Sequence, residues 1–413
     1  MRWIRPLAAG GHPAVVGAKA HGLSVLARLG LPVPPGFVLT TDLHRAVRAT
    51  GRLPRSLPGE LATALDALPG RAGTGPVAVR SGAVVSMPGM LATVLDVRGA
   101  DAVLGAIAHV LASWDAPRAR TYRRLHDVPD DAGTAVVVQA MVAGDRDERS
   151  ASGVAFSRDP VTGAPVPYGE VAFRAPGVAV VSGTGTTRPL TELATRNAAA
   201  WAELLAALRL VERHHRDVCH VEFTIESGRL WLLQVRRGGV AASAAARIAV
   251  GLAEDGILSR TEAVGRVDLA GPAVALRLGA GVPVLTRGTG AAPGLAAGRA
   301  ALTADDAVRL AGHGPVILVR PTTSPADLHG LAAASGVVTF RGGPTSHAAV
   351  VARAMGKPAV VGATETTVRE GAEITIDGTT GIVAAGVHCG VTPGDDPALK
   401  LLRQWSTYGL AEN

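Results

Sequence analysis

The chain has 413 residues, of which 47% are hydrophobic, 18% charged and 3% aromatic. This is enough apolar material for several cores, so two to four domains are expected rather than a disordered chain. The formal charge is +7, but it comes almost entirely from scattered arginines. Because the chain has no basic run and almost no aromatic side chains on which bases could stack, we do not expect it to bind nucleic acid.

Membrane insertion and secretion are not expected either. The sequence has no uninterrupted apolar run that is long enough to span a bilayer, and its first residues lack the apolar core of a signal peptide. Its two cysteines, Cys219 and Cys389, are too few for a disulfide framework or a zinc site. A reducing, cytoplasmic location is therefore expected.

The first part of the chain mixes helix and strand signals. Residues 17–30 carry an apolar stripe with helical spacing, and residues 37–39 begin a strand after a proline-rich turn. A short strand at residues 77–79 leads into a glycine- and methionine-containing loop at residues 80–90. Strand signals return at residues 134–142, so this part is predicted to be a mixed sheet covered by helices.

A hairpin is predicted at residues 219–236, with its turn near Ser227 and Gly228. A three-residue turn gives three apolar pairs on one face: Val221 with Val235, Phe223 with Leu233, and Ile225 with Trp231. The opposite face then carries polar side chains from both strands, namely His220, Glu222, Gln234 and Arg236. Such a polar cluster on one face of a buried hairpin is typical of a binding site.

The remaining elements form a linker and a compact α/β unit. Residues 238–287 are alanine-rich and are predicted to be helical, with a helix start near Ser259. From residue 288 the pattern changes to short alternating elements. We predict strands at 316–319, 336–340 and 359–361, helices at 325–334 and 347–355, and a final hairpin at 373–384.

The strongest chemical signal is the segment 341–362, which reads Gly-Gly-Pro-Thr-Ser-His before its helix. A Gly-Gly turn lets the backbone approach a ligand closely, and Thr345 or Ser346 can cap the helix. His347 then lies in the first turn, where free N–H groups and the helix dipole favour an anion. With a pKa near neutrality, a histidine there is a usable nucleophile. A lone histidine would more simply be a packing or capping residue.

The whole segment 341–362, however, resembles the phosphohistidine signature of the pyruvate, phosphate dikinase and phosphoenolpyruvate synthase family. Further segments resemble the same family: residues 17–23, 30–37, 79–90, 152–160, 222–236, 288–294 and 316–327. The Ser-Met-Pro-Gly-Met run at 86–90 favours the pyruvate, phosphate dikinase branch.

This resemblance implies roles for particular residues. Lys19 and Arg80 would grip ATP phosphates under the loop that follows Arg80, and Glu222 with His220 would form the Mg²⁺ site. The nucleotide-binding set is Lys19, Arg80, Ser86, Met87, Gly89, Gln139, Met141, Glu222, Gln234 and Arg236. The catalytic set is His347, Arg80, Thr345 and Ser346. Taken alone, Lys19 and Arg80 would be ordinary surface charges and the loop a Pro-Gly turn, although two exposed methionines argue against a plain turn.

Two positions depart from the family pattern. Where relatives have an acid two residues before the metal-binding glutamate, this chain has His220. The segment 174–179 lacks a glutamate that would face the nucleotide, with Val178 in its place. The sequence also ends near residues 401–405, where the family's pyruvate-binding barrel would begin.

The expected architecture is an α/β and α+β multidomain protein. An ATP-grasp nucleotide-binding domain (1–237) would be followed by a helical linker (238–287), a swivelling α/β phosphohistidine domain (288–390) and a C-terminal stub (391–413).

The expected function is an ATP-dependent phosphotransferase that phosphorylates its own His347 and passes the phosphoryl group to an acceptor. ATP and Mg²⁺ would be required, with inorganic phosphate as a co-substrate. The acceptor would come from elsewhere: a separate pyruvate-binding barrel subunit, if this chain is one half of a split dikinase, or an unrelated acceptor protein or small molecule. Two alternatives stay open: a kinase for a different small-molecule acceptor, and a catalytically degenerate regulatory or binding protein, which the changes at His220 and Val178 favour.

Overall fold

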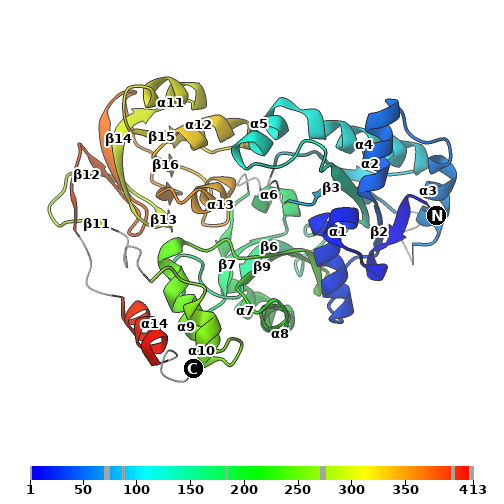
Figure 1. Ribbon diagram of the computed structural model, residues 1–413, viewed down its shortest axis with the longest axis horizontal. Coiled ribbons are helices and arrows are strands. Elements are labelled where there is room, and N and C mark those ends of the chain that lie inside the picture. The colour runs from blue at the N-terminus through cyan, green and yellow to red at the C-terminus, as the bar shows by residue number, and fades with distance from the viewer. Residues whose placement is uncertain are drawn as a thin grey trace. The chain divides into compact units, whose positions relative to one another are not determined.

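The computed structural model describes residues 2–68, 75–85, 87, 89–181, 185–269, 276–391 and 396–408 (Figure 1). The chain divides into two units. The first comprises Met1–Ser150 and Glu222–Val235, and the second comprises Ala151–Val221 and Arg236–Asn413. The predicted division into four consecutive parts stays a prediction. None of the described helices is long and apolar enough to cross a membrane.

The first unit is built on a five-stranded sheet with the order β1-β2-β5-β3-β4. Its strands are β1 (Ile4–Pro6), β2 (Gly36–Leu39), β3 (Val77–Ala83), β4 (Thr93–Val97) and β5 (Thr134–Ala140). Its helices are α1 (Pro13–Arg28), α2 (Thr41–Thr50), α3 (Leu57–Asp66), α4 (Ala100–Ala112) and α5 (Pro117–Leu125). The central strand β5 is almost wholly buried, which explains its run of β-branched residues.

A single apolar core joins this sheet to its helices. Leu39 of β2 and Val138 of β5 cluster with Leu43, Leu61 and Ile107, which come from α2, α3 and α4. The predicted elements at 37–39, 77–79 and 134–142 are confirmed by β2, β3 and β5. The helix predicted at 17–30 corresponds to α1.

The hairpin of β9 (Cys219–Glu226) and β10 (Arg229–Arg237) is confirmed, but the face predicted to be buried near its turn is wrong. Only Ser227 and Gly228 lie between the strands, and both have positive φ angles, 51° and 89°. A two-residue turn of this kind matches the twist of the strands, and the face that is buried beside it differs from the face that a three-residue turn would bury. The fully buried apolar side chains of β10 are therefore Leu230 and Leu232, whereas Trp231 and Leu233 are half-buried.

The second unit contains further strands of the hairpin's sheet, whose order is β10-β9-β6-β7-β8. These strands are β6 (Ala151–Phe156), β7 (Tyr168–Phe173) and β8 (Arg188–Pro189). The helices next to them in the chain are α6 (Gly177–Val181), α7 (Glu192–Arg196) and α8 (Ala198–His215).

An eight-stranded sheet, ordered β12-β19-β18-β14-β15-β16-β17-β13, carries the predicted α/β unit. Its strands are β12 (Val284–Arg287), β13 (Thr289–Ala292), β14 (Leu295–Ala301), β15 (Val316–Arg320), β16 (Gly336–Thr339), β17 (Ala359–Val361), β18 (Glu373–Asp377) and β19 (Ile382–Ala385). Strands β14 to β17 run parallel and are connected by α11 (Ala304–Ala311), α12 (Leu328–Ala333) and α13 (His347–Ala354). Parallel strands need such crossover helices, which confirms the predicted alternation.

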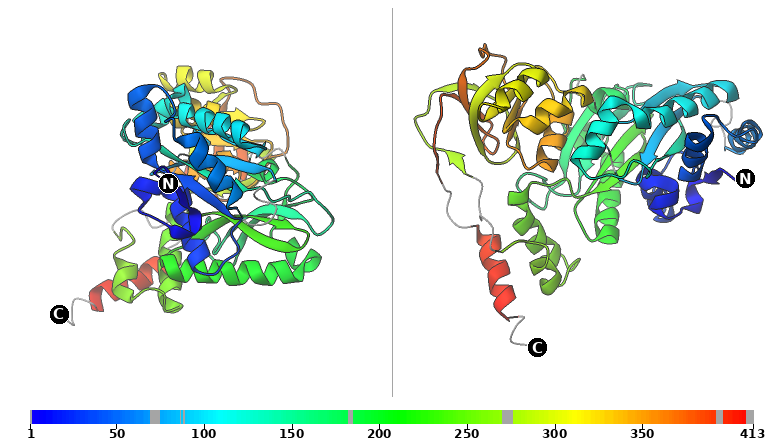
Figure 2. Two further views of the ribbon diagram at one scale, coloured as in Figure 1. Left: turned by 90° about the vertical axis from the view of Figure 1, so that its right-hand side faces the viewer. Right: turned by 45° about the horizontal axis from the view of Figure 1, so that its top comes forward.

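Residues 238–287 form the predicted helices only in part. They contain the helices α9 (Ala245–Glu254) and α10 (Arg260–Val264), followed by the strands β11 (Arg277–Leu278) and β12. Strand β11 pairs with β20 (Gly390–Val391). The segment expected as a stub contains a helix, α14 (Pro397–Tyr408), which packs beside α9 and α10 (Figures 1 and 2). Its Leu399 and Leu402 are buried in one cluster with Leu252 of α9.

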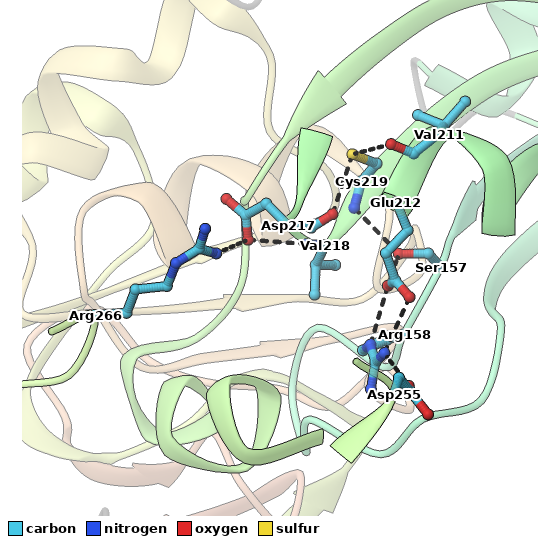
Figure 3. A network of polar contacts seen from close by, with 9 residues as sticks. All are labelled: Ser157, Arg158, Val211, Glu212, Asp217, Val218, Cys219, Asp255 and Arg266. Carbon is cyan, nitrogen blue, oxygen red and sulfur yellow. Dashed lines mark hydrogen bonds and ion pairs between the residues drawn. The ribbon is translucent and has the colours of Figure 1, made fainter. Parts of the chain in front are cut away.

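A buried ion pair ties the segment that follows β6 to helices of the second unit (Figure 3). Arg158 is 2% exposed, and its Nε and Nη2 atoms each lie 3.0 Å from a carboxylate oxygen of Glu212 on α8. Nη2 also lies 2.5 Å from Asp255, which follows α9. The Ser157 hydroxyl donates to Glu212 at 2.7 Å and accepts from the amide of Cys219 at 3.1 Å. A buried carboxylate thus receives donors from a charged and a neutral partner.

Removing this guanidinium should strongly destabilise the second unit. We expect Arg158→Met to lower the opening free energy of the β6 amides by about 3–5 kcal/mol, because it leaves Glu212 buried without its cation. Native-state hydrogen exchange measures this free energy. The matched control is Arg266→Met, which removes a half-exposed partner 3.6 Å from Asp217 and should cost under about 1 kcal/mol. Equal effects of the two variants would contradict the role of the buried pair.

His44 in α2 ties together two strands of the first unit. Its side chain is 2% exposed, and its Nδ1 atom accepts from the amide of Thr134 at 2.9 Å. The Thr134 hydroxyl in turn accepts from the amide of Gly82 at 3.1 Å, at the end of β3. Burial, together with Arg48 and Arg123, lowers the pKa of His44 to about 4. The ring is therefore neutral at pH 7, as an acceptor must be.

This lowered pKa predicts a pH-dependent stability. The folded state holds the His44 proton less tightly than the unfolded chain does. The contribution of His44 to the free energy of unfolding is therefore fully present above pH 6.5 and is lost as the pH drops from 6.5 towards 4. The loss should reach roughly 3 kcal/mol at pH 4. Denaturant unfolding of the wild type and of His44→Asn, which keeps an acceptor but does not titrate, measures this difference. An identical pH dependence in both proteins would rule out His44 as its source.

Candidate functional site

A break in helix α1 places Lys19 beside the end of β3. Gly17 has φ 76° and ψ 158°, values outside the helical range. A Cβ atom at Gly17 would lie 1.8 Å from the carbonyl oxygen of Gly82, so only glycine permits this approach. A Cβ atom at Gly82 would lie 3.5 Å from the Cβ atom of Lys19. Lys19 therefore lies where the loop after β3 begins.

Arg80 of β3 brings together the two hairpin residues that the sequence predicted to converge. Its Nη2 atom donates to Glu222 Oε2 at 3.2 Å and to Gln234 Oε1 at 3.4 Å, and Nη1 donates to the carbonyl of Leu233 at 2.9 Å. The Arg80 and Glu222 side chains are 13% and 19% exposed. The convergence of Glu222 and Gln234 is confirmed, and it places a cation, a carboxylate and an amide oxygen at one partly open position.

The loop after β3 is described in part, and Ser86 lies outside the described residues. Met87 and Met90 are 8% and 0% exposed, so the expectation of exposed methionines is wrong. The carbonyl of Met90 accepts from Nε of Arg118 at 3.0 Å, which anchors the loop to α5. Gly89 is exposed and has φ 71°, a conformation that glycine adopts without strain.

Gln139 and Met141 lie at the end of β5. Gln139 is 2% exposed and donates through Nε2 to the carbonyl of Pro34 at 3.0 Å. The backbone amide of Met141 donates to the carbonyl of Pro76 at 3.0 Å. These bonds hold the strand end in place, and a role of either residue in nucleotide binding stays a prediction.

His220 belongs to the second unit, whereas Glu222 belongs to the first. The His220 ring lies against Phe156, with the ring centroids 4.8 Å apart. The predicted sharing of a metal ion by His220 and Glu222 therefore stays a prediction. So does the phosphate contact of Arg236, a half-buried residue of the second unit. Within the described residues, no group of three or more His, Cys, Asp or Glu side chains is arranged to hold a metal ion.

His347 is the first residue of α13, which begins beyond the carboxyl end of β16. Its Nδ1 atom lies 3.2 Å from the Thr323 hydroxyl, which follows β15. Ligands of parallel sheets bind at this end of the strands. The pocket here is lined by Thr322, Thr323, Arg341, Gly342, Ser346, His347 and Ala348.

The chemistry of the His347 ring follows from its partners. Nδ1 is bonded to Thr323, while Nε2 is buried and has no hydrogen-bond partner. A buried N–H without a partner is costlier than an unpaired lone pair, so we assign the proton to Nδ1. Burial lowers the pKa of His347 and Asp327 partly opposes this effect, so the neutral form of the ring is favoured. Nε2 then presents a lone pair, as a nucleophile requires.

The two residues before His347 behave differently from a simple cap. Ser346 occupies the N-cap position, but its side chain makes no capping bond and its Oγ atom is buried without a partner. The amide of Thr345 donates at 2.9 Å to Oε2 of Glu170 on β7, and the Thr345 hydroxyl donates to the same oxygen. The sequence did not indicate Glu170 as a site residue. The only sequence feature at this position is a single acidic residue in a short buried strand, and this feature does not indicate which residue it contacts.

Two models of known protein families match different parts of this chain. A family model described as "Pyruvate phosphate dikinase, AMP/ATP-binding domain" matches residues 43–198. A second, described as "PEP-utilising enzyme, mobile domain", matches residues 312–381, which include the His347 pocket. The chain therefore combines a segment similar to an ATP-binding domain with a segment similar to the mobile domain of PEP-utilising enzymes.

Curated relatives narrow this class. The chain is 42% identical over 340 residues to pyruvate, phosphate dikinase of Rhizobium meliloti, an alignment that covers 73% of this chain and 37% of the relative. It is 42% identical over 310 residues to the enzyme of the same name from Clostridium symbiosum, covering 69% and 35%. The chain therefore belongs to the pyruvate, phosphate dikinase and phosphoenolpyruvate synthase family. It spans little more than a third of the length of these relatives.

The assigned tautomer of His347 can be measured. At neutral pH, ¹⁵N NMR should show a protonated Nδ1 and an unprotonated Nε2, because Thr323 accepts from Nδ1. In Thr323→Val this acceptor is lost, and the two tautomers should become mixed. Thr364→Val, at a position outside the pocket, is the control and should leave the ring signals unchanged. A wild-type spectrum with the proton on Nε2 would contradict the assignment.

Proposed function

We propose that this protein is an ATP-dependent phosphotransferase that phosphorylates its own His347 and passes the phosphoryl group to an acceptor. The observation that carries the proposal is the His347 ring, with Nδ1 bonded to Thr323 and the Nε2 lone pair unpaired beside an arginine-containing pocket. The similarity to pyruvate, phosphate dikinases supports the same chemistry.

In the proposed first step, the lone pair of Nε2 attacks a phosphorus atom of ATP. A bond from Nε2 to phosphorus forms, the bond from that phosphorus to its bridging oxygen breaks, and the departing nucleotide keeps the electron pair. The ring gains positive charge as the bond forms, and the Nδ1–H···Oγ1 bond to Thr323 stabilises this charge. The free N–H groups at the start of α13 and the side chain of Arg341 favour the phosphoryl oxygens.

ATP would be held in the first unit by Lys19, Arg80 and the loop that ends at Met90. Phosphoryl transfer depends mainly on positioning and on neutralising phosphate charge, and the placement of Lys19 and Arg80 supports both roles. Phosphorylation of His347 then requires that the two units meet at the nucleotide during the reaction. In dikinase chemistry Nε2 would attack the β-phosphorus, so that AMP leaves and the ring carries a pyrophosphoryl group; inorganic phosphate would then take the γ-phosphoryl group, leave as pyrophosphate and give phosphohistidine.

The residues near Arg80 fit a magnesium ion. The carboxylate of Glu222 and the amide oxygen of Gln234 converge on one guanidinium, and both are the oxygen ligands that Mg²⁺ prefers. Glu222 would hold the ion, with Gln234 beside it, and the ion would supply neutralisation of the triphosphate charge. The imidazole of His220 is a poorer ligand for this hard cation.

The proposed acceptor is pyruvate bound by a separate barrel subunit, or another small molecule. We further propose a cytoplasmic location.

The test uses ATP labelled at the β position and, separately, at the γ position. Label that is stable in base and labile in acid would identify phosphohistidine, and the position that transfers label identifies the group that moves. His347→Ala should abolish labelling while nucleotide affinity is retained, and Glu222→Gln should reduce labelling about tenfold or more. The control His329→Ala removes an exposed histidine of α12 and should label normally.

Labelling that persists in His347→Ala would refute the proposal, since another residue would then be the carrier. Absence of labelling in the wild type, together with absence of ATP binding, would favour a regulatory or binding protein.

A further inference from the structure

Glu170 makes an unusual set of contacts for a residue outside the pocket. It lies in β7 and is 8% exposed. Its Oε2 atom accepts from both the amide and the hydroxyl of Thr345, and its Oε1 atom accepts from the hydroxyl of Thr187 at 2.6 Å. Three donors on one buried carboxylate hold it in a single orientation, since each donor that was lost would leave buried charge unsatisfied.

The backbone of the loop is shaped to receive this carboxylate. A Cβ atom at Gly343 would lie 1.9 Å from Oε1 of Glu170, and 2.4 Å from its Cδ atom. These distances are far shorter than any tolerated contact, so any side chain at position 343 would push the loop off the carboxylate. The Gly-Gly turn before His347 thus serves a contact within the protein as well as any approach of a ligand.

A buried cation balances the charge of Glu170. Arg353, on the same helix as His347, is 7% exposed, and burial lowers its pKa to about 10. The negative charge of Glu170 is among those that oppose this lowering, together with Tyr168 and Asp159. Arg353 also donates to the carbonyls of Ala291 at 2.8 Å and Gly239 at 3.1 Å. The helix bearing His347 is therefore held at both its first turn and its last.

We propose that Glu170 is a positioning residue for His347, acting through Thr345. Fixing the amide and hydroxyl of Thr345 fixes the loop that supplies Arg341, Gly342 and Ser346 to the pocket wall and sets the first turn of α13. The direction of the Nε2 lone pair then depends on a carboxylate that does not touch the reacting atoms. This inference rests on the proposed function only for its catalytic consequence, since the contact itself can be tested without ATP.

The first test is hydrogen exchange of the Thr345 amide in the intact protein without nucleotide. Glu170→Ala should raise its exchange rate about ten- to a hundredfold, because a bond to a charged acceptor is lost. Glu170→Gln keeps an amide oxygen and should fall in between. Gly343→Ala should produce the same increase with the carboxylate intact. The control Glu192→Ala, a half-exposed position on α7 in the same unit, should change nothing.

A general loss of stability would also speed exchange, so amides of β16 and β17 are followed in the same spectra. If these accelerate together with Thr345, or if the Thr345 amide is unaffected by Glu170→Ala, the proposal is overturned.

The second test measures phosphorylation of His347 in a single turnover. A positioning role predicts that Glu170→Ala slows the rate about tenfold or more while ATP affinity is unchanged, and that Glu170→Gln recovers part of it. An unchanged rate in Glu170→Ala, with Thr345 exchange accelerated, would overturn the positioning role and leave only a structural contact. If the wild type forms no phosphoenzyme, the proposed function fails, and the exchange experiment still decides whether Glu170 holds the loop.

Discussion

The proposed chemistry of His347 depends on a neutral imidazole with one fixed proton and one free lone pair. The Thr323 hydroxyl meets this requirement by bonding Nδ1, and burial meets it by disfavouring the charged ring. Both conditions depend on the parallel sheet, because Thr323 follows β15 and His347 begins the helix after β16. Neighbouring parallel strands end at the same edge, which is why two residues 24 positions apart can share a hydrogen bond.

Buried charge is distributed over the protein by the same rule of local compensation. Arg158 forms ion pairs with both Glu212 and Asp255. Arg80 donates to Glu222 and to a backbone carbonyl, and Arg353 interacts electrostatically with Glu170. In each case a guanidinium connects elements that are distant in sequence. Its several N–H groups in a fixed plane allow one side chain to satisfy two or three acceptors at once. This explains how a chain with three lysines and many arginines uses its positive charge.

Close backbone approach is the second recurring device. Gly17 lies against the carbonyl of Gly82, and Gly343 lies against the carboxylate of Glu170, each at a distance that excludes a Cβ atom. The first contact sets where Lys19 leaves α1, and the second sets the loop before His347. These two glycines therefore act by allowing a neighbouring polar group to approach the backbone closely. The position of each candidate site residue thus depends on the packing around its glycine.

Local pattern was enough to determine much of this protein. Alternation of short apolar runs with helical stripes identified the strands and helices of the mobile domain, because those periods are written in neighbouring residues. The placement of His347 in the first turn of its helix and the convergence of Glu222 with Gln234 followed in the same way. The face of the hairpin that is buried near its turn did not, since Ser227 with Gly228 fits a turn of two residues or of three, and only the burial of Leu230 and Leu232 shows which was used.

Tertiary structure alone decided the contacts that give the site its chemistry. Glu170 and Thr345 are 175 positions apart, and no periodicity or motif links a lone acid in β7 to a threonine before α13. The partner of Nδ1, the burial of Met87 and Met90, and the charge balance around Arg353 are of the same kind. Each depends on which surfaces pack together, and a one-residue change in register or a single added Cβ atom would alter it. The sequence therefore determined which residues can carry the chemistry, and packing decided which groups hold them in place.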